Sequence, residues 1–228
     1  MAEKRTVDVS LTVRFFFFFF LCVDIANVYF LCNYAKKRYV MKISFDLDAV
    51  IFNMKPLELV AFNMAGLSYK KPTFWGEYEK IVYDKLDELW GDDMLYTMPV
   101  LDKGIPCILN TLLSRPDLDL FFVTERKLKQ PEKTFKQLQN SGIHCRFDQV
   151  YDRDGLKSDT LKVLKPDIHF DDSPLVVQGC LDKNIPVVMI SNNSTLYNHY
   201  LRNRVEHYKN LRTALIKKGI YVPQKSCY

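Results

Sequence analysis

The sequence predicts an α/β protein built on a doubly wound parallel sheet. From Met41 onward, short apolar runs alternate with amphipathic stretches, which is typical of a sheet covered by helices on both faces. Acidic residues follow two of the apolar runs, at Asp46 and Asp171. Ligands of such sheets bind at the carboxyl ends of the strands, so these positions predict the functional site.

The first part of this body is expected to contain one strand and three helices. The apolar run 43–47 predicts the strand, and helices are predicted over 56–67, 74–90 and 101–113. In 74–90 aromatic and aliphatic residues recur at helical spacing, and Gly91 follows as a stop signal. We interpret this aromatic stripe as ordinary helix core.

The middle part alternates strand and helix more regularly. Strands are predicted over 118–123 and 145–150, the second of them short or merely extended, and helices over 131–141 and 156–164. Pro131 suits the first turn of its helix because the missing N–H has no partner there.

The last part follows the same alternation. Strands are predicted over 167–170 and 185–190, and Ser173 precedes a helix predicted over 174–183. In 195–217 apolar residues recur on one face and basic residues on the other, which predicts a single long amphipathic helix.

Composition limits the class of protein. The chain has 228 residues, of which 48% are apolar, so it can bury one good core and extended disorder is excluded. Residues 1–40 carry a net charge of +3 out of the total of +5, which leaves +2 for residues 41–228. A nearly neutral body argues against a nucleic-acid partner, because such proteins carry a locally basic surface.

The first forty residues contain the unbroken run Phe15–Phe20 and end near the basic cluster 36–38. Residues 15–34 are about long enough to cross a bilayer, but Asp24 near their middle opposes insertion. Three interpretations stay open: a dispensable or wrongly assigned extension before Met41, a membrane anchor with a cytoplasmic body, and a cleaved signal peptide.

The six cysteines are scattered without a C-x-x-C motif. His144 beside Cys145 lacks the spacing of metal ligands, so we expect neither a zinc site nor a disulfide framework. This usage suits a reducing compartment, and we expect the body to be cytoplasmic.

Polar residues that could perform chemistry follow the predicted strands. They are Asp46 and Asp48 after the first strand, Thr124 after the second, Lys157 at the start of a helix, and Asp171 and Asp172 after the fourth strand. Carboxylates brought so close together repel one another unless a cation lies among them. Oxygen ligands without soft competitors favour Mg²⁺.

The spacing of Asp46 and Asp48 has a chemical meaning. In an extended Asp-x-Asp both carboxylates project from one face of the strand, and Leu47 packs on the other. One carboxylate can attack a phosphoryl group and form an aspartyl-phosphate, while the other transfers protons. Lys157 and Thr124 can bind the phosphate oxygens.

The ordered set of these segments resembles the four motifs of the haloacid dehalogenase-like (HAD) phosphohydrolase superfamily. The segments are 43–48 (Ile-Ser-Phe-Asp-Leu-Asp), 121–124 (Phe-Phe-Val-Thr), Lys157 and 169–173 (His-Phe-Asp-Asp-Ser). They span nearly all of residues 41–190. The second Asp of the first motif favours phosphate chemistry, since the dehalogenases of this family lack it.

The resemblance implies a role for each matching residue. Asp46 would be the nucleophile and Asp48 the general acid and base. Thr124 and Lys157 would bind the substrate phosphate, and Arg126 either reaches the phosphate or pairs with Glu125. Mg²⁺ would be held by the four aspartates Asp46, Asp48, Asp171 and Asp172.

The resemblance also implies where a cap lies. The long gap between the first two motifs holds two extra helical segments, so a small helical cap is expected over 54–98, with the core formed by 41–53 and 99–228. A cap in this position, together with the Asp-Asp fourth motif, is most similar to the 5′(3′)-deoxyribonucleotidase type.

Some assignments stay open at this point. Lys162 competes with Lys157 for the role of the phosphate-binding lysine. Family members usually have Gly after the second Asp, so Ala49 must either adopt a conformation that favours glycine or alter the turn. His169 is interpreted as a packed core histidine.

The leading hypothesis is therefore a Mg²⁺-dependent phosphomonoester hydrolase that acts on a nucleoside monophosphate or a similar small metabolite. One alternative, suggested by Ala49, is a catalytically weak HAD-like binding or regulatory protein, tethered to a membrane if residues 15–34 form a span. A phosphatase of nucleic-acid ends is a third hypothesis, which the nearly neutral body disfavours. The oligomeric state has no signal in the sequence.

Overall fold

The computed structural model describes residues 39–70, 79–90, 92–126, 130–152, 155–191, 201 and 203–223. The chain divides into two units, residues 1–39 and 40–228, and all elements described below belong to the second unit. The extension 1–40, with the candidate membrane span 15–34, lies outside the described residues except for its last two positions. Among the described helices, none has the length and apolar character that a membrane crossing requires.

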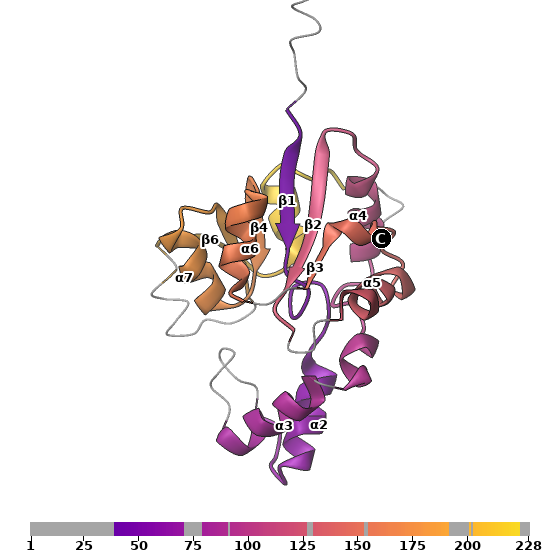
Figure 1. Ribbon diagram of the computed structural model, residues 1–228, viewed down its shortest axis with the longest axis vertical. Coiled ribbons are helices and arrows are strands. Elements are labelled where there is room, and N and C mark those ends of the chain that lie inside the picture. Colours follow the sequence, from indigo (N-terminus) through magenta and orange to yellow (C-terminus); the bar gives the residue numbers. More distant parts are fainter. Residues whose placement is uncertain are drawn as a thin grey trace, which may run out of the picture. The chain divides into compact units, whose positions relative to one another are not determined.

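The described strands form one six-stranded sheet in the order β3-β2-β1-β4-β5-β6, and every neighbouring pair is parallel. The strands are β1 Met41–Phe45, β2 Leu118–Thr124, β3 Val150–Asp152, β4 Ile168–Asp171, β5 Val187–Ile190 and β6 Glu206–Tyr208. This sheet with its flanking helices confirms the doubly wound α/β fold that the alternating pattern predicts (Figure 1).

The helices follow most of the predicted segments. They are α2 Lys55–Met64, α3 Lys80–Trp90, α4 Ile105–Leu113, α5 Pro131–Asn140, α6 Lys157–Leu164, α7 Pro174–Asp182 and α9 Leu211–Lys217, with short 3₁₀ helices η1 Asp93–Thr97 and η2 Phe147–Gln149. Proline lies in the first turn of α2, α4, α5 and α7, where its missing N–H costs nothing.

The core lies on both faces of the sheet, because successive side chains of a strand point to opposite faces. Phe122 packs in a cluster that includes side chains of α4 and α9, whereas Phe121 and Val123 pack with side chains of α6 and α7. Phe45 of β1 stacks on Phe170 of β4 with ring centroids 5.4 Å apart. These contacts fix the strands whose ends carry the predicted site residues.

The expected long helix over 195–217 is wrong. Glu206–Tyr208 form β6, which pairs with β5, and a separate helix α9 begins at Leu211. Asn210 caps this helix, because its side chain accepts a hydrogen bond from the N–H of Thr213. The hydrogen bonds of β6 with the edge of β5, and the cap at Asn210, outweigh the helical preference that the spacing of the apolar residues indicates. Positions 195–200 of the predicted helix lie outside the described residues.

Two further boundaries differ from the sequence-based prediction. In the segment 145–150 the structure has η2, and β3 begins only at Val150. This residue is the first of β3 to pair with β2, opposite Phe122. The helix predicted from Leu101 begins at Ile105. Residues 101–104 instead form a turn in which the Asp102 carboxylate accepts a hydrogen bond from the N–H of Gly104.

One cysteine is bonded although the scattered positions do not predict it. Cys107 forms a disulfide, and a single bonded cysteine among the described residues is not the disulfide framework that the sequence argues against. Cys145 and Cys180 are free and buried, as expected of cysteines that serve as small apolar side chains. The part of the chain that the structure describes offers no group of cysteine and histidine ligands for a metal.

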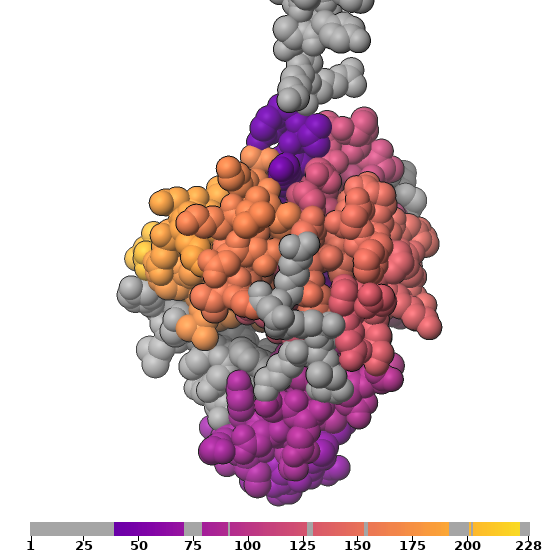
Figure 2. Space-filling view, viewed as in Figure 1, coloured from indigo at the N-terminus to yellow at the C-terminus, as the bar shows by residue number. Residues whose placement is uncertain are grey.

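The region 54–98, for which the cap is predicted, contains α2, α3 and η1. Figure 1 shows α2 and α3 together beyond the end of the sheet to which β1 points, and Figure 2 shows the same part of the chain, coloured purple to magenta, at the lower end of the view. The two segments that connect this region to the sheet run side by side, since Phe52 and Val100 form an antiparallel bridge. The N–H of Asn53 donates to the carbonyl oxygen of Pro99 at 2.7 Å. The bridge lies at the predicted boundaries, and closure of a cap over the site stays a prediction.

Candidate active site

The candidate site begins where β1 ends. The N–H of Asp46 donates to the carbonyl oxygen of Phe170 at 2.8 Å, which continues the pairing of β1 with β4 by one residue. Asp46 is buried, and Leu47 beyond it is completely buried in the core. Asp46 thus lies at the carboxyl end of the central strand, as the alternation of the motif predicts.

Lys157 joins the ends of β1 and β4. Its Nζ lies 2.7 Å from Asp46 Oδ1 and 2.9 Å from Asp171 Oδ2, and the side chain is buried. Lys162, the competing lysine, is exposed on the last turn of the same helix. The geometry therefore favours Lys157 as the lysine of the site.

Glu125 has a role that sequence reasoning missed. Its carboxylate accepts a hydrogen bond from the backbone N–H of Lys157, the first residue of α6. The N-cap residue is Leu156, whose apolar side chain cannot accept a hydrogen bond from the helix. A carboxylate at a helix N-terminus satisfies a free N–H and interacts favourably with the helix dipole, so Glu125 fixes the start of α6 and with it Lys157.

Three acidic side chains meet beside Lys157. Carboxylate oxygens of Asp46, Asp171 and Asp172 all lie within 4.8 Å of one another. Asp171 is completely buried, and its Oδ1 also accepts a hydrogen bond from the N–H of Ser173 at 2.8 Å. We call Asp46, Asp171 and Asp172 the acidic group; its oxygen ligands and spacing fit a hard divalent cation such as Mg²⁺.

The pKa values in this group diverge. Burial, with the repulsion from Asp171 and Asp48, outweighs the attraction of Lys157 and raises the pKa of Asp46 to about 7. Burial, together with the charges of Asp46 and Asp171, raises the pKa of Asp172 well above its usual value. Although burial opposes it, contact with Lys157 and His169 lowers the pKa of Asp171 to about 2. A cation among these oxygens would relieve the repulsion that the first two carboxyls experience.

The positive charge of Lys157 is stabilised by the two carboxylates that it contacts. Burial alone would lower the pKa of this ammonium group, but the charges of Asp171 and Asp46 and their hydrogen bonds outweigh burial, so the pKa is raised. Lys157 therefore stays protonated at every physiological pH. It can offset negative charge at the site without exchanging a proton itself.

Asp48 does not join the acidic group. Its two carboxylate oxygens are held by Arg126, through Nε at 3.0 Å and Nη2 at 2.7 Å. The Arg126 side chain is fully buried, and Nη1 donates to Oε1 of Gln137 at 2.8 Å. Arg126 thus pairs with Asp48 rather than with Glu125, and its two-pronged contact orients the Asp48 carboxylate.

Thr124, the last residue of β2, is buried at the carboxyl end of the sheet in the strand next to β1. Its position matches the hydroxyl expected at the second motif.

Ala49 adopts the conformation that family members give to glycine. Its φ is 61°, in the left-handed region. The turn closes through a hydrogen bond from the N–H of Ala49 to the carbonyl oxygen of Phe52 at 2.9 Å. This conformation costs an L-residue roughly 1–2 kcal/mol. Ala49 therefore tolerates the strained turn instead of altering it.

Replacing Ala49 by Gly is expected to stabilise the protein by about 1 kcal/mol, because glycine adopts positive φ without a steric penalty. The midpoint of thermal unfolding, measured by circular dichroism, should rise by about 2–4 °C. Ala65→Gly is the matched control: Ala65 has φ −78°, so the same substitution should not stabilise. A lower midpoint for Ala49→Gly would contradict the assignment of strain to this turn.

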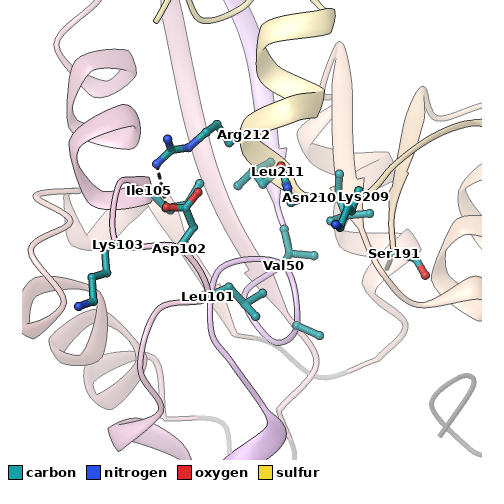
Figure 3. Close-up of a pocket in the computed structure, with 12 residues that line it drawn as sticks. Val50, Leu101, Asp102, Lys103, Ile105, Ser191, Lys209, Asn210, Leu211 and Arg212 are labelled. Atoms are coloured by element: carbon teal, nitrogen blue, oxygen red, sulfur yellow. Dashed lines mark hydrogen bonds and ion pairs between the residues drawn. The ribbon is translucent and has the colours of Figure 1, made fainter. Parts of the chain in front are cut away.

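A cavity of about 520 Å³ lies to one side of these residues (Figure 3). Its walls come from Ala49 and Val50, the turn 101–105, the end of β5 and residues 209–212. The Asp102–Arg212 ion pair, with 2.8 Å between Oδ1 and Nη2, closes one wall. The cavity contains none of the predicted site residues, so we do not assign the substrate to it.

Comparison with known proteins supports the fold. No protein-family model matches the sequence, and no curated protein matches it either. Solved structures do match. A haloacid dehalogenase-like hydrolase family protein from Streptococcus pneumoniae has a TM-score of 0.54 at 16% identity, over 78% of this chain and 98% of that one. A predicted phosphatase from Clostridium acetobutylicum has a TM-score of 0.52 at 15% identity, over 81% and 100%.

A third match is a protein of Bacillus subtilis described as a HAD-hydrolase bound to magnesium. Its TM-score is 0.50 at 11% identity, over 79% of this chain and 99% of that one. At these identities the likeness is one of fold. It confirms the fold that the four motifs imply and leaves the nucleotidase type as a prediction.

Proposed function

We propose that this chain, which has the fold of the HAD-like hydrolases, is a Mg²⁺-dependent phosphomonoester hydrolase that forms an aspartyl-phosphate on Asp46. The observation that carries the proposal is the buried contact of Asp46 with Lys157 inside the acidic group at the end of β1. A buried carboxylate held by a permanent cation is the arrangement that covalent phosphoryl transfer needs.

In the first step an oxygen of Asp46 attacks phosphorus and the bond from phosphorus to the leaving oxygen breaks. Asp48, when protonated, gives its proton to that oxygen, so the product leaves as an alcohol. In the second step water attacks the phosphorus of the aspartyl-phosphate, Asp48 takes a proton from the water, and the bond to Asp46 breaks. Inorganic phosphate is released and the carboxylate of Asp46 returns.

The other residues bind and orient. Lys157 and Thr124 would contact the non-bridging phosphate oxygens, while Arg126, which holds both carboxylate oxygens of Asp48, would orient that residue. Mg²⁺, held by the acidic group, would offset the negative charge of the phosphate and of the aspartates. The side chain of Asp48 lies with Arg126, so the proposal leaves it out of the ligand set.

The proposed substrate is a small phosphomonoester, with a nucleoside monophosphate as the first candidate. This follows from the nearly neutral body and from the similarity of the motif pattern to the deoxyribonucleotidase type. The disulfide bond of Cys107 does not support the cytoplasmic location that the sequence predicts. The Ala49 turn, which the structure retains, favours this enzyme over a HAD-like protein that has lost its activity.

The test is phosphate release by the full chain with and without metal. We expect turnover of a panel of nucleotides, sugar phosphates and p-nitrophenyl phosphate in Mg²⁺. We expect its loss in EDTA and its return when Mg²⁺ is added in excess, because the acidic group needs a cation. Equal turnover in EDTA would contradict metal dependence. No turnover of any substrate would favour the catalytically weak binding protein.

A further inference from the structure

A chain of buried polar side chains leads from β1 to the acidic group. Ser44 Oγ lies 2.9 Å from His169 Nδ1, and His169 Nε2 lies 2.9 Å from Asp171 Oδ2. All three residues have no exposed surface. Ser44 and His169 are direct partners in the β1–β4 pairing, and His169 and Asp171 share one face of β4.

The direction of these hydrogen bonds follows from the contacts. Asp171 Oδ2 is a carboxylate oxygen that also accepts from Lys157 Nζ, so His169 Nε2 donates to it. In the neutral ring Nδ1 then accepts from the hydroxyl of Ser44, which can donate or accept. Asp171 therefore assigns the tautomer of His169, and the hydrogen bond with Ser44 holds the ring in place.

His169 completes the set of donors around Asp171. Oδ2 accepts from Lys157 and His169, and Oδ1 accepts from the N–H of Ser173. Without the imidazole, Lys157 would be the only side chain holding Oδ2 among the contacts described. The steps proposed above use neither the charge nor the protons of His169, so orientation is the contribution that its contacts allow.

We propose that His169, held by its hydrogen bond with Ser44, is a positioning residue that orients Asp171 and thereby the Mg²⁺-binding oxygens of the acidic group. The inference rests on the proposed function, because it concerns the metal that function requires. Partners that orient a metal ligand in this way typically contribute 10–100-fold to metal affinity or activity.

The test measures Mg²⁺ binding to the full chain by titration calorimetry without substrate. The double variant Ser44→Ala/His169→Leu removes the hydroxyl and the ring together, so no buried hydroxyl is left without a partner. We expect its dissociation constant for Mg²⁺ to rise by about 10–100-fold. His169→Gln, which keeps an N–H donor, should recover most of this loss.

Two controls separate positioning from folding. Thermal unfolding of each variant reports its stability, and His144→Gln makes the same substitution at an exposed position. At saturating Mg²⁺ the KM for the phosphomonoester should stay near that of the wild type, because His169 has no exposed surface through which it could bind a substrate. Steady-state kinetics of the double variant checks this value.

The outcomes are distinguishable. A folded double variant with unchanged Mg²⁺ affinity overturns the role of His169, and so does a His169→Gln variant as weak as the double variant. If the wild type itself neither binds Mg²⁺ nor releases phosphate, the proposed function is overturned and this inference with it. If the wild type is active and the variants bind Mg²⁺ as tightly as the wild type does, the role of His169 is overturned and the proposed function stands.

Discussion

Replacement of Asp46 by Asn is expected to lower phosphate release by a factor of about 10⁴ or more at saturating Mg²⁺. The amide keeps the shape and the contact distance to Lys157 but is a poor nucleophile, so no aspartyl-phosphate can form. The measurement is a phosphate-release assay under the conditions in which the wild type is most active. Turnover close to that of the wild type would exclude Asp46 as the nucleophile.

The same variant is expected to fold at least as stably as the wild type when metal is absent. Burial raises the pKa of Asp46 from 3.8 to about 7, so the folded state binds a proton that the unfolded state loses first. The wild type therefore loses stability as the pH rises from about 4 to 7, and the loss is complete above pH 7. The amide of the variant cannot ionise, so the stability of the variant does not fall over this pH range for this reason.

Urea unfolding in EDTA at pH 5 and pH 8 measures this difference. The control variant is Asp148→Asn, since Asp148 is an exposed carboxyl whose only described contact is a surface pair with Arg146. That substitution should leave both activity and unfolding near the wild type. If Asp46→Asn lost activity only together with its fold, the result would speak against a chemical role.

Replacement of Lys157 by Met is expected to give the largest loss of stability in the site, about 3–5 kcal/mol at pH 8. The substitution leaves Asp46 and Asp171 buried without the ammonium group that lies 2.7 and 2.9 Å from them. Phosphate release should fall as well, because the positive charge beside the phosphate is lost. Urea unfolding and the phosphate-release assay measure the two effects.

The loss should be smaller at pH 5, where Asp46 can take up a proton and no longer needs a cation. Lys162→Met is the matched control: it makes the same substitution in the same helix, but its side chain is exposed. We expect that variant to stay within about 0.5 kcal/mol of the wild type. Equal effects of the two substitutions would show that the ion pairs of Lys157 contribute nothing.

The part of the site that can be predicted from the sequence depends on strand ends. Asp46, Thr124 and Asp171 each follow an apolar run, and in a parallel sheet those ends meet at one edge. Lys157 is harder to place, because a lysine on a helix is usually solvated; only its position at the first turn of α6 distinguishes it from Lys162.

Other contacts have no local signal. Arg126 and Asp48 are 78 residues apart, and Ser44 and His169 are 125 residues apart. Each pair meets only after strands and helices have packed in one register. The resemblance to known motifs therefore suggests Arg126 as a phosphate ligand and leaves His169 as a core residue, while the structure gives both a partner among the acidic side chains.

The sequence by itself determined the alternation of strand and helix and the polar residues that follow the central strands. Hydrophobic periodicity is a local property of the chain, and the residue after an apolar run can be read directly. The sequence could not determine that 206–208 extend the sheet, since their strand exists only through pairing with β5. Nor could it determine which partner each buried charge takes. A buried charge pairs with whichever group the packed elements bring within hydrogen-bond distance, and only the tertiary structure decides that.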